Sequence, residues 1–373
     1  MKLRSFLVGF FSFCFFGLVL EPIHIQFPET SSHRSVQSPA TAELNDDVVQ
    51  AAFTPNIASR TAFSGVAPLH SSMPALESQI KALMARYSYL QAGMFFLDLD
   101  NGNYLDIRGD RIFPAASTIK LPILVAFFQD VDAGKVSLTE KLVLRRDLIT
   151  NGSGTMQYAR VGKKFTALET VNKMITISDN TATNMIIARL GGIAQLNKRF
   201  QRWGLHNTVI HHLLADLRGT NTTSAKDMTR VLALLVNHKL VSLQSRATIL
   251  DILSRTTIRT LLPAGLGPGA TIANKTGDIG FVIGDAGLIT MPSGKRYIAA
   301  VFVRRPYQDL RGRLFVRQIS HLAYSYLSQP FPSDFYNNAL RGTSARRALL
   351  AKRQRYQQQK ARRPGRRLIL SEN

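Results

Sequence analysis

The segment 115–121, Ala-Ala-Ser-Thr-Ile-Lys-Leu, places Ser117 three residues before Lys120 at the start of an apolar run. On a helix, residues three apart share a face, and a serine in the first turn lies near the free amide donors of that helix. A serine hydroxyl is a poor nucleophile without an adjacent base, and a desolvated lysine can be that base if its pKa is lowered. The same spacing also arises by chance in a chain of this length, as a helix cap followed by a surface lysine.

Two further motifs follow in the chain. The triplet 178–180, Ser-Asp-Asn, lies between a helical pattern that ends near Ile175 and another from Thr181 to Leu190, so its side chains can point into a cleft. The triplet 275–277, Lys-Thr-Gly, directly precedes a strand-like run from Phe281 and could line the rim of a sheet. Each triplet alone is a weak signal. The three motifs in this order indicate one shared site.

The rest of the chain predicts an α+β fold. A helical pattern begins at Pro74, a hairpin turns at 100–103, strand-like runs cover 281–290 and 297–304, and a closing amphipathic helix covers 314–326. Between Ser117 and Leu253 the patterns are mainly helical. The simplest assembly is one antiparallel sheet built from both ends of the domain, flanked by the terminal helices, with an inserted helical lobe. The active site is then expected between lobe and sheet.

Composition and charge separate the domain from its two ends. The 373 residues are 45% hydrophobic and 19% charged, as in a globular protein. Lys2 and Arg4 precede an uncharged run, so residues 1–20 are interpreted as a signal peptide or signal anchor. Residues 21–73 are interpreted as a flexible spacer, 74–328 as the domain and 329–373 as a basic tail, disordered or partly helical. The only cysteine, Cys14, lies in the signal, which leaves the domain without a disulfide.

The N-terminal signal predicts an exported protein, periplasmic or extracytoplasmic, either released or held at the inner membrane. Residues 341–367 contain eleven Lys or Arg and no acid, within a chain of net charge +23. Such a tail could bind an anionic wall polymer or a membrane surface, or could simply be solvated; export argues against nucleic acid as its partner.

The three motifs resemble the set found in class A β-lactamases and penicillin-binding proteins. Further stretches are similar to class A segments: 113–117 (Phe-Pro-Ala-Ala-Ser), 151–154 (Asn-Gly-Ser-Gly), 178–184 (Ser-Asp-Asn-Thr-Ala-Thr-Asn) and 262–265 (Leu-Pro-Ala-Gly). The resemblance covers about 74–327. It implies a β-lactamase/transpeptidase-like fold and a serine hydrolase that needs no cofactor.

The resemblance implies a chemical role for four residues. Ser117 is the expected acylated nucleophile, and Lys120 is its base or proton relay. Ser178 is expected to pass a proton to the leaving nitrogen. Lys275 is expected to support that transfer and to attract the carboxylate of the substrate.

The resemblance also implies substrate-binding residues. Asn180 is expected to bind the acyl-side amide, and Thr276 the substrate carboxylate. The backbone N–H of the nucleophile and that of Asp278, the residue after Gly277, are the expected oxyanion hole. Arg259 is a further candidate for the carboxylate, with a surface or supporting arginine as the other interpretation.

The sequence departs from the class A pattern in one loop. Class A enzymes carry a glutamate there that activates the water for deacylation. Residues 205–223 contain no glutamate, and Leu213 or Leu214 stands near the expected position. The only acid in the segment is Asp216, close to Arg218, which favours an ion-pair or turn residue. Release of a bound β-lactam is therefore predicted to be slow.

Three functions remain open from these residues. The favoured one is a penicillin-binding acyltransferase that acts on the D-alanyl-D-alanine end of peptidoglycan stem peptides, as a carboxypeptidase or transpeptidase, and acts as a monomer. The second is a slow or narrow-spectrum β-lactamase that uses Asp216 as base. The third is a non-catalytic wall-binding or β-lactam-sensing protein.

A metal hydrolase is not supported, because the adjacent His211 and His212 have no third ligand at a recognised spacing. Asp179 is expected to be structural.

Overall fold

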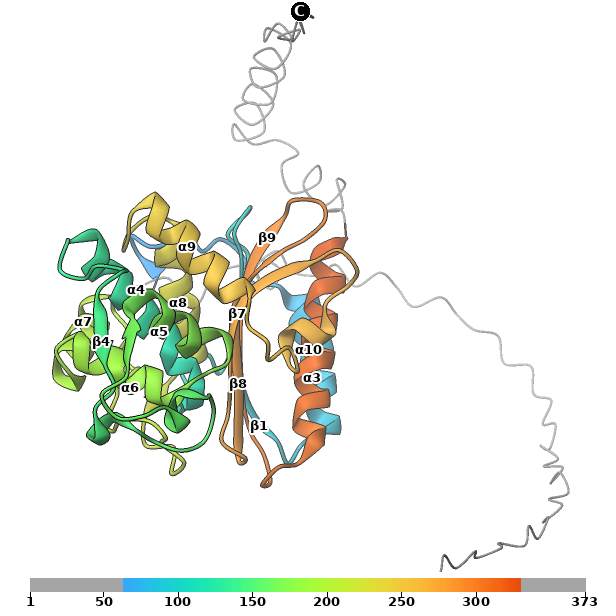
Figure 1. The fold of residues 1–373 in the computed structure, drawn as a ribbon. Coiled ribbons are helices and arrows are strands. Elements are labelled where there is room, and N and C mark those ends of the chain that lie inside the picture. Colours follow the sequence, from blue (N-terminus) through green and yellow to red (C-terminus); the bar gives the residue numbers. More distant parts are fainter. Residues whose placement is uncertain (1–62, 330–373) are drawn as a thin grey trace, which may run out of the picture. The chain divides into compact units, whose positions relative to one another are not determined.

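The computed structural model describes residues 63–329, in which one five-stranded antiparallel sheet separates two helical layers (Figure 1). The predicted signal, the first part of the spacer and all but the first residue of the tail lie outside the described residues. In spatial order, the strands of the sheet are β2 (Tyr104–Ile107), β1 (Gln91–Asp98), β9 (Arg296–Arg304), β8 (Val282–Thr290) and β7 (Thr271–Asp278).

The sheet joins the two ends of the domain, as predicted. β1 pairs with β9 along its whole length, with Phe95 opposite Ala300. Since side chains alternate across a strand, Phe95 and Leu97 face the inserted lobe, whereas Met94 and Phe96 face the terminal helices. All four side chains are buried, so the sheet has a hydrophobic core on each face.

The terminal helices α3 (Pro74–Arg86) and α10 (Leu310–Ser328) cover one face of the sheet (Figure 1). Pro74 stands at the first position of α3, where its missing N–H costs no hydrogen bond. Asp309 caps α10 by accepting a hydrogen bond from the backbone N–H of Arg311. Their positions confirm the predicted flanking helices.

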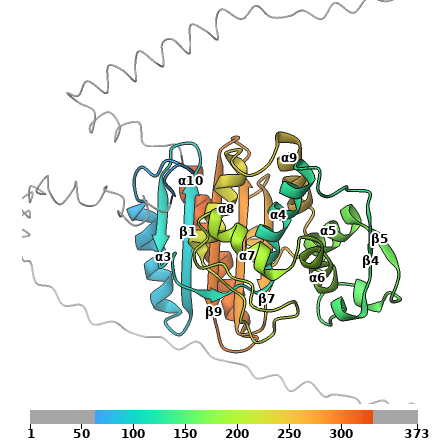
Figure 2. The same cartoon turned by 90° about the vertical axis from the view of Figure 1, so that its left-hand side faces the viewer.

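The inserted lobe covers the other face of the sheet (Figure 2). Its helices are α4 (Lys120–Asp132), α5 (Ala167–Thr176), α6 (Asn180–Arg189), α7 (Ile193–Arg202), α8 (Ala225–Val236) and α9 (Leu243–Ser254). Its 3₁₀ turns are η1 (Ala116–Ile119), η2 (Arg146–Leu148) and η3 (Met156–Tyr158), and η4 (Leu262–Gly265) lies beyond the lobe. Two short strand pairs complete it: β3 (Phe113–Pro114) with β6 (Thr222–Thr223), and β4 (Lys141–Val143) with β5 (Lys164–Thr166).

Side-chain caps explain where several lobe helices begin. Thr166, Ser224 and Ser242 each accept a hydrogen bond from the backbone N–H three residues later, at the starts of α5, α8 and α9. These polar residues stand just before helices with buried apolar side chains, which is where capping residues are expected.

The strand β7 was not expected from the sequence. It carries the Lys-Thr-Gly motif inside the strand, whereas the motif was placed just ahead of the strand from Phe281. Asn274, Lys275 and Thr276 form a polar run that lacks the alternation of a half-buried strand. Pairing of all eight residues with β8 and burial on both faces make the strand.

The sequence-based spacer boundary was wrong for residues 63–73. Phe63 is buried and stacks on Phe95, with ring centroids 5.0 Å apart. The N–H of Tyr104 donates to the carbonyl of Ser71, and the N–H of Met73 donates to the carbonyl of Tyr104. The buried residues of this segment lie three or four positions apart, but Gly65 and Pro68 stand between them and the segment forms turns and irregular structure, so no element was predicted here.

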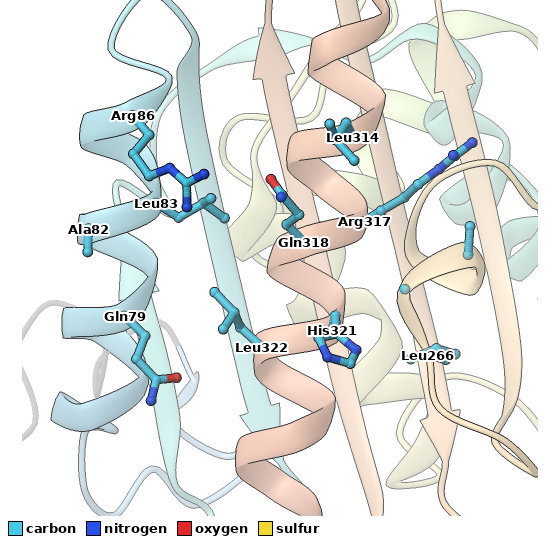
Figure 3. Close-up of a pocket in the computed structure, with 12 residues that line it drawn as sticks. Gln79, Ala82, Leu83, Arg86, Leu266, Leu314, Arg317, Gln318, His321 and Leu322 are labelled. Atoms are coloured by element: carbon cyan, nitrogen blue, oxygen red, sulfur yellow. The ribbon is translucent and has the colours of Figure 1, made fainter. Parts of the chain in front are cut away.

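An open groove of about 720 Å³ lies between α3, α10 and η4, on the side of the sheet away from the lobe (Figure 3). Leucines line much of it, among them Leu83 and Leu322, with Arg86 and Arg317 also in the wall. Within residues 63–329 no helix has the length and apolar character needed to cross a membrane.

Replacing Phe63 by Ala is expected to lower the free energy of unfolding by about 3–5 kcal/mol, because a fully buried aromatic ring is lost from the core. The measurement is denaturant unfolding of the purified protein. Tyr158→Ala is the control, since Tyr158 is 82% exposed and its loss should change stability by less than about 0.5 kcal/mol. Equal midpoints for the two variants would show that residues 63–73 do not belong to the folded domain.

Candidate active site

The three sequence motifs meet at one place between the lobe and the free edge of the sheet. Ser117 lies in η1, and Lys120 is the first residue of α4. Ser178 lies in the junction between α5 and α6, and Asn180 begins α6. Lys275 comes from β7, the edge strand that packs against η1.

The amine of Lys120 is the centre of this arrangement. Its Nζ lies 2.6 Å from the carbonyl oxygen of Ser178 and 2.8 Å from Oδ1 of Asn180. It also lies 3.1 Å from Oγ of Ser178 and 3.3 Å from Oγ of Ser117. Both carbonyl oxygens can only accept, so they take two N–H donors. If the amine is neutral, its two N–H groups serve these oxygens and its lone pair can accept a proton from a serine hydroxyl. This arrangement suits a general base.

The surroundings of Lys120 favour that neutral amine. Burial lowers the pKa of Lys120 well below its ordinary value, the positive charge of Lys275 lowers it further, and Asp179 opposes the shift. Lys120 is completely buried. It can therefore accept the proton of Ser117 at a pH at which an exposed lysine would be charged.

Two backbone positions beside the nucleophile are conformationally unusual. Ala116 has a φ of 47° and Ser178 a φ of 58°, both in the left-handed region that residues with a Cβ seldom adopt. Such positions cost about 1–3 kcal/mol each and occur frequently at active sites. Here they lie next to Ser117 and at Ser178 itself.

The direction of backbone groups along β7 places a donor near Ser117. Ile279 donates its N–H to Val282 of β8, and N–H directions alternate along a strand. The N–H of Asp278 therefore lies on the free edge, which borders η1. A Cβ at Gly277 would come within 2.8 Å of the backbone nitrogen of Ser117, so only glycine allows this approach. The two expected oxyanion donors are thus brought to the same edge.

Lys275 is a second buried lysine. Its Nζ donates to the carbonyl of Thr276 at 2.6 Å. Burial lowers the pKa of Lys275 to about 8, and the negative charge of Asp285 opposes that shift. Burial in turn raises the pKa of Asp285 to about 6, although hydrogen bonds from Asn274 and Leu262 favour its charged form. Lys275 is thus a cation at neutral pH that loses its charge only slightly above it.

The expected substrate-binding side chains come from both sides of the site, Asn180 from α6 and Thr276 from β7. Asn180 is oriented from both ends of its amide, because Nδ2 donates to the carbonyl of Asn151 at 3.1 Å while Oδ1 accepts from Lys120. Oγ1 of Thr276 lies 3.4 Å from the carbonyl of Ile258. Arg259 directly follows Ile258 and is exposed, and among residues 63–329 its guanidinium has no hydrogen bond or ion pair. Arg259 therefore adjoins the residue that contacts Thr276, and its side chain is available to a ligand.

In the loop 205–223, which lacks the glutamate of class A enzymes, Leu213 and Leu214 are the residues near the expected position of that glutamate. Both backbone groups of Leu214 are held by Asn184, whose Oδ1 accepts the N–H at 2.8 Å and whose Nδ2 donates to the carbonyl at 2.6 Å. Leu214 is buried, whereas Leu213 is 36% exposed. Asn184 lies within the quoted stretch 178–184, but the sequence alone assigned it no role.

Asp216 is a turn residue and not a free base. Its Oδ1 accepts hydrogen bonds from the N–H and the hydroxyl of Thr220, at 3.0 and 2.9 Å. Its Oδ2 accepts from the N–H of Asn221 at 2.6 Å. Across the described residues no ion pair joins Asp216 to Arg218, so the turn interpretation is correct and the ion-pair interpretation is wrong.

Asp179 is structural, as predicted. One carboxylate oxygen caps α6 by accepting from the N–H of Ala182 at 2.9 Å. The other accepts from the N–H groups of Thr155 and Met156, at 2.7 and 2.8 Å. It therefore fixes the segment 151–156 against the helix junction that carries Ser178.

Comparisons with known proteins agree with this geometry. Residues 75–327 match the β-lactamase enzyme family. The chain is 25% identical over 274 residues to the extended-spectrum β-lactamase PER-1 of Pseudomonas aeruginosa, covering 68% of this chain and 87% of PER-1. The solved structure of PBP-A matches with 53% identity and a TM-score of 0.69, covering 70% of this chain and 98% of PBP-A. A PBP-A mutant with leucine replaced by glutamate, solved as an acyl-enzyme complex with penicillin G, matches equally well. This chain belongs to the β-lactamase enzyme family, in the class A β-lactamase and penicillin-binding protein group, and is a serine hydrolase.

Proposed function

We propose that the protein is a penicillin-binding acyltransferase that cleaves the D-alanyl-D-alanine end of peptidoglycan stem peptides. The observation that carries the proposal is the combination of an assembled Ser117–Lys120–Ser178 site with a leucine where the deacylating base of class A enzymes stands. Such a site can form an acyl-enzyme from a peptide or a β-lactam, but it lacks the carboxylate that clears a β-lactam quickly.

In the proposed acylation, Oγ of Ser117 attacks the carbonyl carbon between the two alanines while its proton moves to Nζ of Lys120. The oxyanion that forms accepts hydrogen bonds from the N–H groups of Ser117 and Asp278, and one such donor typically contributes on the order of 3 kcal/mol to transition-state stabilisation. Ser178 then gives its proton to the leaving nitrogen, the C–N bond breaks, and D-alanine departs. Lys120 returns a proton to Ser178.

Substrate orientation follows from groups along β7. The terminal carboxylate of the stem peptide is placed against Thr276 and the cation of Lys275, with Arg259 as a further partner at the rim. The amide on the acyl side is placed against Asn180, which Lys120 and Asn151 hold in one orientation. These contacts hold the scissile carbonyl beside Ser117 before the reaction, so part of the entropic cost is met by binding.

The second half of the reaction separates the possible functions. Water would release the acyl group as a shortened stem peptide, and an amine would form a new cross-link. A β-lactam gives the same ester with Ser117, but its leaving nitrogen stays tethered to the acyl group. Because Leu214 offers no base and the carboxylate of Asp216 is held by three hydrogen bonds from its own loop, this ester is expected to persist. The β-lactamase alternative, which needed Asp216 as base, loses its main support.

The similarity to PBP-A supports this proposal because it extends over almost the whole of that chain at 53% identity. The PBP-A variant was solved with penicillin G as an acyl-enzyme, which makes penicillin G the natural probe here. The proposed substrate also fits the predicted export, since stem peptides lie outside the cytoplasm, and the basic tail could hold the enzyme near an anionic wall polymer.

Penicillin G is expected to form a covalent adduct on Ser117 that survives removal of free drug. The measurement is intact-protein mass against time, with Ser117→Ala as the control that should show no adduct. Rapid adduct loss with continued drug consumption would instead identify a β-lactamase. No adduct on the wild-type protein would contradict both enzymatic functions and leave the non-catalytic binding protein.

The acylation rate by penicillin G is expected to rise and then fall with pH. The rising limb reflects loss of the proton of Lys120, whose pKa burial lowers, because only the neutral amine is a base. The falling limb should lie near pH 8, where Lys275 loses the positive charge that attracts the carboxylate of the drug. Stopped-flow or quenched mass measurements from pH 5 to about 10 would give the profile.

Lys275→Arg tests the origin of the falling limb. Arginine keeps its charge throughout this range, so the limb should move beyond pH 10 even if the larger side chain lowers the maximum rate. A falling limb that stays near pH 8 in Lys275→Arg would assign it to another group.

A further inference from the structure

The carboxylate of Asp278 is bound by two arginines, although the residue was singled out only for its backbone N–H. Oδ1 accepts a hydrogen bond from Arg305 at 2.7 Å, and Oδ2 accepts one from Arg313 at 3.0 Å. Oδ1 also accepts the backbone N–H of Gly280 at 2.9 Å. The expected oxyanion donor therefore belongs to a residue whose side chain is held from three directions.

Arg305 is the anchor of this cluster. Its side chain is 1% exposed, and all three of its nitrogens donate. Nε donates to the carbonyl of Gly280 at 2.9 Å, and Nη1 donates to the carbonyl of Asp309 at 3.0 Å. Arg305 thus ties the turn between β7 and β8 to the start of α10. Its removal would disturb the fold, so it is a poor probe of function.

Arg313 differs because it is partly exposed and makes one hydrogen bond in the described structure, the one to Asp278. It lies in the first turn of α10, and its side chain is 38% exposed. Two positive charges and one negative charge leave the cluster with a net charge of +1. Without Arg313 the net charge is zero.

The charge of Asp278 presents a problem for the proposed chemistry. An oxyanion that accepts the N–H of Asp278 develops negative charge close to a carboxylate on the same residue. Two negative charges near each other destabilise the transition state, and because the side chain of Asp278 is 30% exposed, solvent screens only part of this repulsion. Arg305 alone brings the net charge of the pair to zero, and Arg313 makes the charge beside the oxyanion positive.

We propose that Arg313 is a positioning and charge-setting residue for the oxyanion hole, acting through Asp278. With Arg305, it offsets the negative charge of the carboxylate of Asp278 and holds that residue so that its N–H stays directed at the reacting carbonyl. This inference rests on the proposed acyl transfer at Ser117. It applies to peptide and β-lactam substrates alike, because both form the same oxyanion.

The test compares the acylation rate by penicillin G in the wild type, Arg313→Gln, Asp278→Asn and the double variant. Arg313→Gln is expected to lower the maximal acylation rate at least about tenfold, without a matching rise in the drug concentration for half-maximal rate, because the lost interaction belongs to the transition state. In the double variant the carboxylate is gone, so its rate should return to within about threefold of Asp278→Asn alone.

Arg311→Gln is the matched control. Arg311 lies in the same turn of α10, and its loss changes the net charge by the same amount, but it pairs with Asp309 and not with Asp278. Its acylation rate should equal that of the wild type. Thermal unfolding of each variant would show whether any slow rate comes from a damaged fold.

The outcomes separate this inference from the function on which it rests. If the wild type is acylated and Arg313→Gln is acylated as fast, the inference fails and the proposed function stands. If Arg313→Gln is slow and the double variant is as slow, Arg313 does not act by offsetting the charge of Asp278, and the inference also fails. A wild type that forms no adduct overturns the proposed function and this inference together.

Discussion

Lys120 is completely buried, and the hydrogen-bond acceptors around its amine are two carbonyl oxygens and two hydroxyls, with no carboxylate among them. Burial penalises the ammonium form, and among residues 63–329 no ion pair of Lys120 offsets that penalty, although the charge of Asp179 opposes it. The same contacts join η1, α4 and the start of α6, so one side chain positions the nucleophile, the second serine and Asn180. Any group that brought a full negative charge to this amine would raise its pKa and lower the fraction of neutral amine that can accept the proton of Ser117.

The free edge of β7 is the second constraint. A catalytic serine needs backbone donors for the oxyanion, and an edge strand offers unpaired N–H groups without a special loop. The cost is an exposed pairing edge, which the protein covers with η1 and with the segment 256–260. Glycine at 277 permits the close approach, and the Asp278 cluster holds the end of the strand.

Much of the fold could be predicted because its terminal strands and helices carry clear apolar periods, and the three motifs are short enough to read in one chain. What could not be predicted depends on distant contacts. β7 is polar and is a strand because β8 pairs with it, and Phe63 is part of the core because Phe95 stacks on it. Asp278 and Arg313 are 35 residues apart, so no spacing rule relates them. Leu213 and Leu214 were equivalent in the sequence, and only burial separates them.

Acylation and release place opposite demands on this site. Acylation needs a neutral lysine, whereas rapid release of a β-lactam ester in class A enzymes needs a carboxylate in the adjacent loop. Here Asn184 holds the backbone of that loop so that Leu214 is buried, and the single acid of the loop is satisfied by donors from Thr220 and Asn221. Freeing Asp216 would leave the N–H groups of Thr220 and Asn221 without this acceptor, so a change that frees the acid would also destabilise the loop. The structural role of Asp216 thus limits the chemistry of the loop, and the prediction of slow release rests on how the loop folds as well as on the missing glutamate.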